Sequence, residues 1–283
     1  MKGESKMKIG FIDKYLDEWH ANHLPEWLRG ATDVEAIYAY EQMATPAEGG
    51  ISGKEWAEEH DAILCDSIEE VVEKSDFLIV LAPSYPESHE ELCDLPLRSG
   101  KPTYVDKTFA PDKEMAKKLI ELAKEHNTPL FTTSAVRYSD ELIDVDTENI
   151  KTISMRGPGP LEMYSIHYIE SIVRLFGPEA ESVMFIGDKE NPAYVIRFSG
   201  NRFATAHQFD WDCPFNISLK YSDEKAPLHI SKCNNFFIGF VKKLVEFFET
   251  AKNPVDYEET IAVIAIRAGI LNAVKTPGEW VNI

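Results

Sequence analysis

Residues Lys8-Ile9-Gly10-Phe11-Ile12 form a short apolar run, and the pattern of residues 19–28 behind it predicts a helix. A buried strand, a tight turn and a helix in this order are typical of the opening of a dinucleotide-binding βαβ unit. The turn of such a unit needs small residues, because backbone N–H groups must come close to a pyrophosphate. This stretch therefore decides the expected fold of the N-terminal half and poses the first question about function.

The turn between this strand and this helix contains no glycine. It reads Asp13-Lys14-Tyr15-Leu16-Asp17-Glu18, and no glycine occurs between Gly10 and Gly30. A carboxylate about 4 Å from a phosphate charge costs roughly 1 kcal/mol in water and several-fold more when partly buried. Two alternatives stay open: a dinucleotide is held in an atypical way, or none is bound.

Composition limits the classes of function. A chain of 283 residues suggests two domains or one large one, and 48 acidic against 29 basic residues give a net charge of −19. Such a surface repels phosphate backbones, so we expect no nucleic-acid partner. The four cysteines form no CxxC pair and are expected to be reduced, mostly buried thiols. The sequence MKGESKMKIGF lacks the apolar stretch of a signal peptide and no window resembles a membrane span, so we expect a cytoplasmic protein with no membrane contact.

Strand and helix patterns alternate over the first half of the chain. Strands are predicted at 8–12, 34–40, 62–65, 77–82, 103–105 and 130–132, and helices at 19–28, 54–60, 67–74, 86–98 and 112–126. Six short strands separated by helices predict a doubly wound parallel sheet. We therefore expect a Rossmann-like domain over residues 1–132.

The pattern changes after residue 132. Helices are predicted at 137–144, 161–176, 235–251 and 257–275, and strands at 150–156, 182–187, 193–199, 202–209 and 215–222. Ser199-Gly200-Asn201 is a hairpin signal between two of these strands. We expect residues 133–283 to form an α+β domain with a mostly antiparallel open sheet and helices against one face.

The motifs between Ser75 and Tyr138, together with the C-terminal end, resemble the glucose–fructose oxidoreductase / inositol dehydrogenase (Gfo/Idh/MocA) family. The family pattern is an Asp before an apolar strand, then Pro, His, Gly-Lys-Pro, Glu-Lys-Pro and an Arg-Phe pair. This chain has, in the same order, Ser75-Asp76 before the strand 77–82, Pro83, His89-Glu90-Glu91-Leu92, Ser99-Gly100-Lys101-Pro102, Val105-Asp106-Lys107-Thr108 and Val136-Arg137-Tyr138, and later Pro254-Val255-Asp256-Tyr257-Glu258-Glu259 and Gly278-Glu279-Trp280-Val281.

The resemblance implies an oxidoreductase with two domains. The first would bind NAD or NADP, and the second would bind the substrate and form a homodimer or homotetramer through its open sheet. Substrates would be sugars, polyols or related hydroxy compounds that gain or lose a hydride.

The resemblance also implies two catalytic residues. Lys107 falls on the Lys of Glu-Lys-Pro, where an ammonium would stabilise alkoxide character on the reacting oxygen, and the alternative is a solvated surface lysine. His167 falls on the substrate-side histidine of the family and would act as general acid/base; the alternative is a packing histidine. Three neighbours depart from the family pattern: Asp106 replaces Glu, Thr108 replaces Pro, and Met163 replaces a carboxylate.

Further positions are expected to bind cofactor or substrate. Glu41 would bind a ribose 2′-OH and favour NAD over NADP, although a solvated loop glutamate fits the pattern nearly as well. Glu170 could orient His167 or pair with Arg174 at i+4. Arg137 could equally form a salt bridge between domains, and His89 could merely lie on a helix. The full sets are Ile12, Asp13, Glu41, Pro83, Ser84 and His89 for the cofactor, and Arg137, Tyr138, Tyr164 and Glu170 for the substrate.

The segment after the turn carries further polar side chains. Asp17, His20 and His23 could share a helical stretch, so a metal or polar ligand is conceivable. Histidines at i and i+3 are common on solvated faces, and we predict no metal.

The leading hypothesis is an oxidoreductase that holds its nicotinamide cofactor atypically. A cofactor-free descendant that binds a sugar-like ligand or a protein partner as a sensor or regulator is the alternative, favoured by the missing glycines, Met163 and Thr108. A lyase or isomerase that uses the same crevice is a third reading.

Overall fold

The structure is a computed structural model that describes residues 6–43 and 49–283. The chain forms two compact units: residues 1–110, 114–133 and 241–255 make the first, and residues 111–113, 134–240 and 256–283 make the second. The sequence analysis predicts a single boundary between residues 132 and 133. In the structure, residues 241–255 also belong to the first unit. Residues 1–5 of the N-terminal segment analysed for a signal peptide lie outside the described residues.

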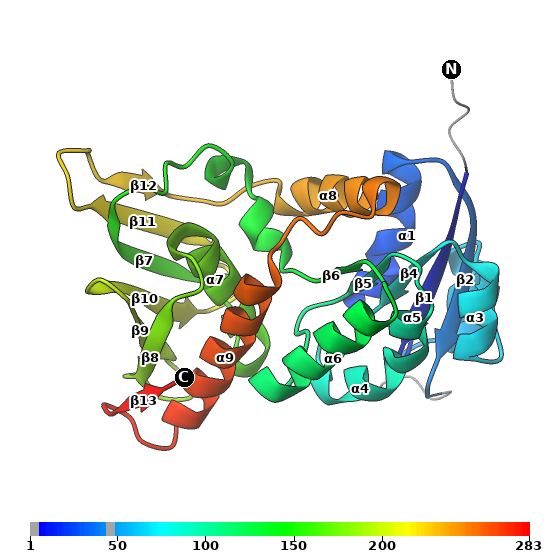
Figure 1. The fold of residues 1–283 in the computed structure, drawn as a ribbon, viewed down its shortest axis with the longest axis horizontal. Coiled ribbons are helices and arrows are strands. Elements are labelled where there is room, and N and C mark those ends of the chain that lie inside the picture. The colour runs from blue at the N-terminus through cyan, green and yellow to red at the C-terminus, as the bar shows by residue number, and fades with distance from the viewer. Residues whose placement is uncertain (1–5, 44–48) are drawn as a thin grey trace. The chain divides into compact units, whose positions relative to one another are not determined.

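The first unit contains the predicted parallel sheet. Its strands are β1 (Met7–Asp13), β2 (Val34–Glu41), β3 (Ile63–Leu64), β4 (Phe77–Val80), β5 (Thr103–Val105) and β6 (Leu130–Phe131). They are ordered β3-β2-β1-β4-β5-β6, and every neighbouring pair is parallel (Figure 1). The strand order reverses between β1 and β4, and ligands of doubly wound sheets bind beyond the strand ends at such a point.

Helices of the first unit pack around this sheet. They are α1 (Trp19–Ala31), α2 (Gly53–Glu59), α3 (Ile68–Lys74), α4 (His89–Leu92), α5 (Asp94–Arg98), α6 (Lys113–Glu125) and the part of α8 (Phe236–Thr250) from Val241 onward. Ser67 is the N-cap of α3, and its Oγ accepts from Glu70 N at 3.3 Å. Gly10 lets α3 approach β1, because a Cβ there would lie 2.5 Å from Val71 Cγ1.

The single helix predicted at 86–98 is wrong. The segment forms a short 3₁₀ turn (Pro86–Ser88) followed by α4 and α5. Pro96 is the physical reason, since proline has no N–H for the carbonyl four residues earlier and its ring clashes with that carbonyl. The break leaves His89 on the one-turn helix α4.

The second unit contains a sheet of seven strands in the order β12-β11-β7-β10-β9-β8-β13. The pair β7–β10 is parallel and the other neighbours are antiparallel. Helices α7 (Leu161–Phe176) and α9 (Tyr257–Ala273) pack on one face of this sheet (Figure 1). The strands are β7 (Ile150–Pro158), β8 (Ala180–Phe185), β9 (Ala193–Phe198), β10 (Arg202–Phe209), β11 (Asn216–Tyr221), β12 (Leu228–Ile230) and β13 (Trp280–Asn282).

This unit follows the sequence prediction apart from three segments. The hairpin signal is confirmed, because β9 and β10 are antiparallel and Gly200 and Asn201 both have positive φ. The helix predicted at 137–144 is instead two 3₁₀ turns, because Ser139 is extended and its hydroxyl donates to Val136 O at 2.6 Å. Strands β12 and β13 were not predicted, since each has only three residues.

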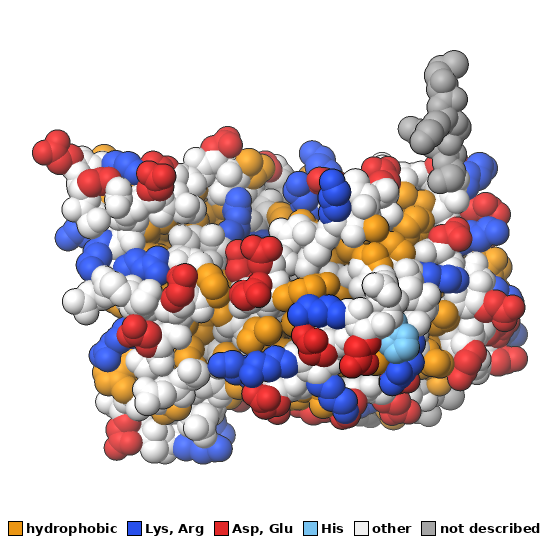
Figure 2. Space-filling model, viewed as in Figure 1, with side chains coloured by type: hydrophobic (Ala, Val, Ile, Leu, Met, Phe, Trp, Pro, Cys, Tyr) orange, Lys and Arg blue, Asp and Glu red, His pale blue; other side chains and the backbone are white. Residues whose placement is uncertain are grey.

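Three general features follow from the structure. The four cysteines are free, and only Cys213 is not buried. In residues 6–43 and 49–283, no helix has the length and apolar character needed to cross a membrane. Acidic and basic side chains are interspersed over the face shown in Figure 2.

Candidate functional site

The carboxyl edge of the first sheet begins with a buried carboxyl group. Asp13 is 1 % exposed, and its Oδ1 accepts from Lys14 N at 2.6 Å and from Ala82 N at 3.0 Å. Its Oδ2 has no hydrogen-bond partner among the described residues. Burial, followed by the charge of Glu18, raises the pKa of Asp13 well above its usual range. The Asp13 side chain thus binds backbone N–H groups at the ends of two neighbouring strands.

Glu18 caps the helix that follows the turn. It stands at the N-cap of α1, and its carboxylate accepts from His20 N at 3.0 Å and from Ala21 N at 2.6 Å. Burial raises the pKa of this carboxyl group. The first amides of α1 are therefore bound by a negatively charged group of the chain itself.

Glu41 holds a third pair of backbone amides. Its Oε2 accepts from Leu16 N at 3.3 Å, and its Oε1 accepts from Gly53 N at 3.0 Å. A Cβ at Gly53 would lie 2.3 Å from this carboxylate, so glycine permits the contact. The alternative of a solvated loop glutamate does not describe Glu41, which ties the turn after β1 to the start of α2.

Aromatic side chains lie beside the turn. Lys14 Nζ lies 4.0 Å from the centre of the Tyr85 ring, and Tyr15 donates a hydrogen bond to the Tyr85 hydroxyl at 3.2 Å. Burial raises the pKa of Tyr15. The ammonium that could offset the acidic turn is thus engaged in a cation–π contact with Tyr85.

A second buried carboxylate lies directly after β5. Asp106 contacts His20 Nδ1 through Oδ2, and its Oδ1 accepts from the Tyr104 hydroxyl at 2.8 Å. Burial raises the pKa of Asp106, but the charge and hydrogen bond of His20, with smaller effects of Lys107 and Tyr104, bring it below its usual value. The sequence did not predict the pair between Asp106 and His20, which are 86 residues apart.

Lys107 is buried, with an exposed fraction of 9 %. The peptide bond between Lys107 and Thr108 is cis. A solvated surface lysine, the alternative that the sequence left open, is therefore wrong. Lys107 is thus a buried lysine at the carboxyl edge of the sheet, and lysines are rarely buried without a functional or structural reason.

The other residues predicted at this edge differ in exposure. Ile12 is fully buried within β1, Pro83 is half-buried and Ser84 is exposed. His89 is fully buried, and its ring nitrogens face Leu81 O and, at 2.9 Å, Phe109 O. Burial lowers the pKa of His89. The His89 ring therefore ties the end of β4 to the segment after β5.

The second unit contains the predicted substrate residues. His167 Nδ1 lies 2.6 Å from Ser134 Oγ, and its ring packs edge-on against Tyr164 and Phe215. The sequence reasoning missed Ser134, because no local pattern links two residues 33 positions apart. The ring of Tyr164 lies against Gly159, where a Cβ would come within 2.3 Å of it.

Arg137 lies in a buried ion-pair network of this unit. Its Nη1 donates to Glu170 Oε2 at 3.0 Å, and its Nη2 contacts Glu259. Burial lowers the pKa of Arg137, but the two carboxylates raise it above its usual value. Arg174 donates to the Arg137 carbonyl at 2.7 Å. Glu170, for which the sequence left open a role beside His167 or a pair with Arg174, thus forms an ion pair with Arg137.

The polar side chains that follow the turn contact different partners. Asp17 accepts from Asn22 Nδ2 and from Ile51 N, each at 2.9 Å. His23 stacks on Trp19, with ring centres 4.3 Å apart, and its Nδ1 lies 2.6 Å from Trp19 O. Tyr138, a predicted substrate residue, is half-buried at the end of a 3₁₀ turn.

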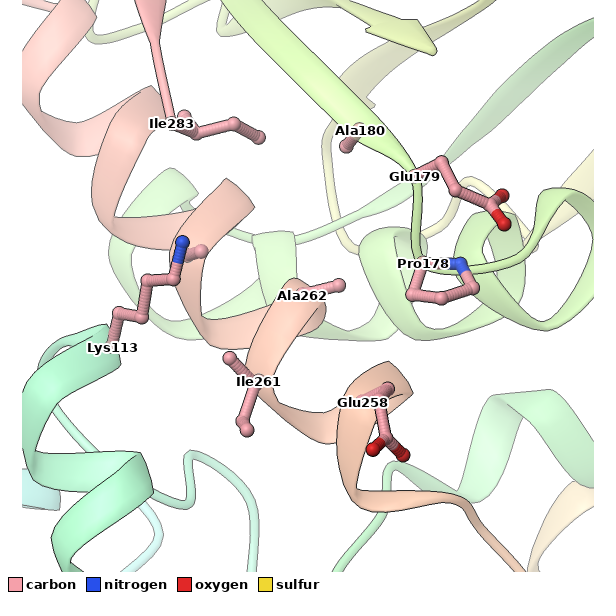
Figure 3. Close-up of a pocket in the computed structure, with 9 residues that line it drawn as sticks. Lys113, Pro178, Glu179, Ala180, Glu258, Ile261, Ala262 and Ile283 are labelled. Carbon is pink, nitrogen blue, oxygen red and sulfur yellow. The ribbon is translucent and has the colours of Figure 1, made fainter. Parts of the chain in front are cut away.

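A separate hollow of about 280 Å³ lies on the second unit (Figure 3). Its walls are mainly apolar side chains of α9 and the C-terminal Ile283, and Figure 3 shows Lys113, Glu179 and Glu258 around them. It contains none of the residues that the sequence predicted for the site.

Comparison with known proteins gives one family match. Residues 15–134 match the family described as "Oxidoreductase family, NAD-binding Rossmann fold" (GFO_IDH_MocA). A search of curated proteins finds no match.

Solved structures share the fold over almost the whole chain. Myo-inositol dehydrogenase from Lactobacillus casei, solved with NAD(H) and myo-inositol, has a TM-score of 0.80 at 14 % identity, covering 99 % of this chain and 97 % of that one. GenD2 from gentamicin A biosynthesis, solved with NAD, has a TM-score of 0.78 at 13 % identity, with coverages of 99 % and 97 %. UDP-N-acetylglucosamine 3-dehydrogenase GnnA from Acidithiobacillus ferrooxidans has a TM-score of 0.75 at 14 % identity, with coverages of 96 % and 98 %.

The turn after β1 does not fit a pyrophosphate in the usual arrangement. That arrangement needs glycines and unoccupied backbone N–H groups at the start of the helix. Here Glu18 binds the amides of His20 and Ala21, while Asp13 and Glu41 bind others around the turn. A dinucleotide bound there would have to displace carboxylates of the chain.

Proposed function

We propose that the chain transfers a hydride between a nicotinamide dinucleotide and a sugar, polyol or related hydroxy compound, because its residues 15–134 match the Gfo/Idh/MocA oxidoreductase family. Similar structures that act on myo-inositol and on UDP-N-acetylglucosamine support this substrate class. The cofactor-free alternative has no support from the comparisons.

The observation that carries the proposal is the burial of Lys107. This lysine follows β5 at the carboxyl edge of the sheet and lies next to the Asp106 carboxylate. An ammonium in a low-dielectric site stabilises negative charge far better than one in water. In our proposal Lys107 donates a hydrogen bond to the reacting oxygen of the substrate and stabilises its alkoxide character.

His167 is the proposed general acid/base. The Ser134 oxygen lies 2.6 Å from Nδ1 and orients the imidazole; in our proposal it accepts the Nδ1 proton, which leaves the lone pair of Nε2 free. During oxidation Nε2 accepts the proton of the substrate hydroxyl, and during reduction the doubly protonated ring returns that proton from Nε2. Tyr164, Arg137, Tyr138 and Glu170 are proposed to shape the substrate pocket, with Arg137 and Glu170 acting through their buried ion pair.

We further propose NAD as the preferred cofactor and a homo-oligomeric state. Glu41 at the end of β2 supports NAD, because its negative charge disfavours the 2′-phosphate of NADP. Asp13, Ile12, Pro83, Ser84 and His89 are proposed to lie at or behind the cofactor. A homodimer or homotetramer in the cytoplasm remains the expected assembly, and light scattering tests its size.

The test combines binding with turnover. The dialysed protein is titrated calorimetrically with NAD, NADH, NADP and NADPH, and polyols and sugars are then screened for cofactor reduction. We expect Lys107→Ala to abolish turnover and leave the folded structure intact, whereas the control Lys118→Ala removes only an exposed ion pair with Glu90. An unchanged rate in Lys107→Ala would remove this lysine from the mechanism, and absence of dinucleotide binding up to millimolar concentration would overturn the proposed function.

A further inference from the structure

We propose that Glu18 is an internal competitor for the pyrophosphate of the cofactor, so that a dinucleotide binds at the start of α1 only when it displaces this carboxylate. The inference rests on the proposed function for the identity of the ligand. Its physical basis is the arrangement of backbone amides and carboxylates around the turn after β1.

The start of α1 is a site that favours negative charge. The first turn of this 13-residue helix has backbone N–H groups without intrahelical partners, and the helix dipole places partial positive charge there. Phosphates bind to such amides in many α/β proteins. In this chain the Glu18 carboxylate contacts two of them, His20 N at 3.0 Å and Ala21 N at 2.6 Å.

Glu18 is an unusual residue for this position. Ser, Thr, Asp and Asn are the preferred N-caps, since their short side chains reach one amide of the first turn. The longer Glu18 side chain places its two oxygens on two successive amides instead. In this respect the carboxylate takes the place of an anionic ligand.

Two further carboxyl groups reinforce the competition. Asp13 binds the amides of Lys14 and Ala82, and Glu41 binds the amide of Leu16. A pyrophosphate in the turn would find these amides occupied, and its negative charges would lie next to the carboxylates of Glu18 and Glu41. Each such charge pair costs about 1 kcal/mol at 4 Å in water and more at a partly buried position. Removal of the Glu18 charge is therefore expected to strengthen dinucleotide binding.

The experiment compares binding to the full-length protein and to variants of α1. Glu18→Ala frees the two amides and removes the charge, and Glu18→Ser keeps a short neutral cap in case the alanine variant folds poorly. The matched control is Glu26→Ala, which removes an exposed carboxylate from the same helix. NADH and ADP are the two probes, because ADP carries a pyrophosphate linkage without nicotinamide. Affinity is measured by calorimetry and by the fluorescence of Trp19, which is next to Glu18.

We expect both Glu18 variants to bind NADH and ADP at least about tenfold more tightly than the natural chain, which corresponds to about 1.4 kcal/mol. The control Glu26→Ala is expected to bind both probes with the affinity of the natural chain. Thermal unfolding of each variant confirms that the comparison concerns folded protein.

The outcomes separate this inference from the proposed function. If the natural chain binds NADH and the Glu18 variants bind it no more tightly, the inference is wrong and the proposed function stands. If the variants gain affinity for ADP but neither they nor the natural chain oxidise or reduce any substrate, the inference stands and the proposed function fails. Failure of Glu18→Ser to bind ADP at millimolar concentration overturns the inference.

Discussion

Asp13 and Asp106 occupy equivalent places at the ends of β1 and β5, yet their environments act on the two carboxyl groups in opposite directions. Both side chains are almost completely buried, at 1 % and 3 % exposure. The pKa of Asp13 is raised by burial and by the charge of Glu18, whereas His20 contributes most to bringing the pKa of Asp106 below its usual value.

The difference shows that burial alone does not decide the charge of a carboxyl group. Backbone amides partner Asp13, and they offset its desolvation only in part. Asp106 contacts the ring of His20 and accepts a hydrogen bond from the Tyr104 hydroxyl. One edge of a sheet can therefore hold one carboxyl group whose pKa is raised and another whose pKa is lowered.

Of the three substitutions that test this comparison, His20→Ala is expected to change the free energy of unfolding most. The variant leaves the buried Asp106 carboxylate without the hydrogen bond of the His20 ring. Because a buried charged group that loses its partner costs about 3 kcal/mol, we expect a loss of that order in the free energy of unfolding at pH 7. Urea-induced unfolding measures this loss.

The matched control for this variant is His23→Ala on the same helix, where the half-buried His23 side chain stacks on Trp19. Its loss should stay below about 1 kcal/mol. A folded-state pKa below the unfolded value gives stability that is present above that value and is lost as the pH falls. The cost of His20→Ala should therefore shrink below about pH 4, and equal losses for both variants at pH 7 would refute the contact between His20 and Asp106 as a source of stability.

Asp13→Asn is expected to stabilise the protein at neutral and alkaline pH. A folded-state pKa above the unfolded value gives stability that is complete below the unfolded pKa of 3.8 and is lost as the pH rises. Asparagine keeps an oxygen for the amides of Lys14 and Ala82 and never ionises. We therefore expect the variant to be more stable than the natural chain at pH 8 and equally stable near pH 4.

Thermal unfolding across this pH range tests the prediction. Asp33→Asn serves as the control, because Asp33 is exposed and the same substitution there should change stability little at any pH. A variant Asp13→Asn that is less stable than the natural chain at pH 8 would show that the Asp13 carboxylate is ionised and well solvated by its amides.

Tyr104→Phe is the smallest of the three changes in side-chain structure, because only one hydroxyl group is lost. It removes the hydroxyl that donates to Asp106 Oδ1 at 2.8 Å while it keeps the ring that packs on Phe131. We expect a loss of about 1–2 kcal/mol and a higher pKa for Asp106, whose remaining partners still favour the ionised form. NMR titration of the Asp106 carboxyl carbon measures the pKa directly, and an unchanged value would exclude Tyr104 as a cause of its shift.

Local sequence patterns predicted most elements of the fold. The alternation of apolar strands and helices gave the six parallel strands of the first sheet and most strands of the second, because side-chain periodicity follows backbone geometry. The predicted helices failed at two places, where Pro96 and the extended Ser139 interrupt them. The three-residue strands β12 and β13 escaped prediction because so short a segment shows no period.

The sequence by itself determined the fold class, the missing glycines of the turn after β1 and the positions of Lys107 and His167 in a family pattern. Only the tertiary structure decided what the acidic residues of that turn do, that Lys107 is buried, and that His20 and Ser134 partner Asp106 and His167. The physical reason is the range of the interactions. Periodicity and capping act over a few residues, whereas these partners are 33 to 86 positions apart and meet only when the sheets and helices have packed.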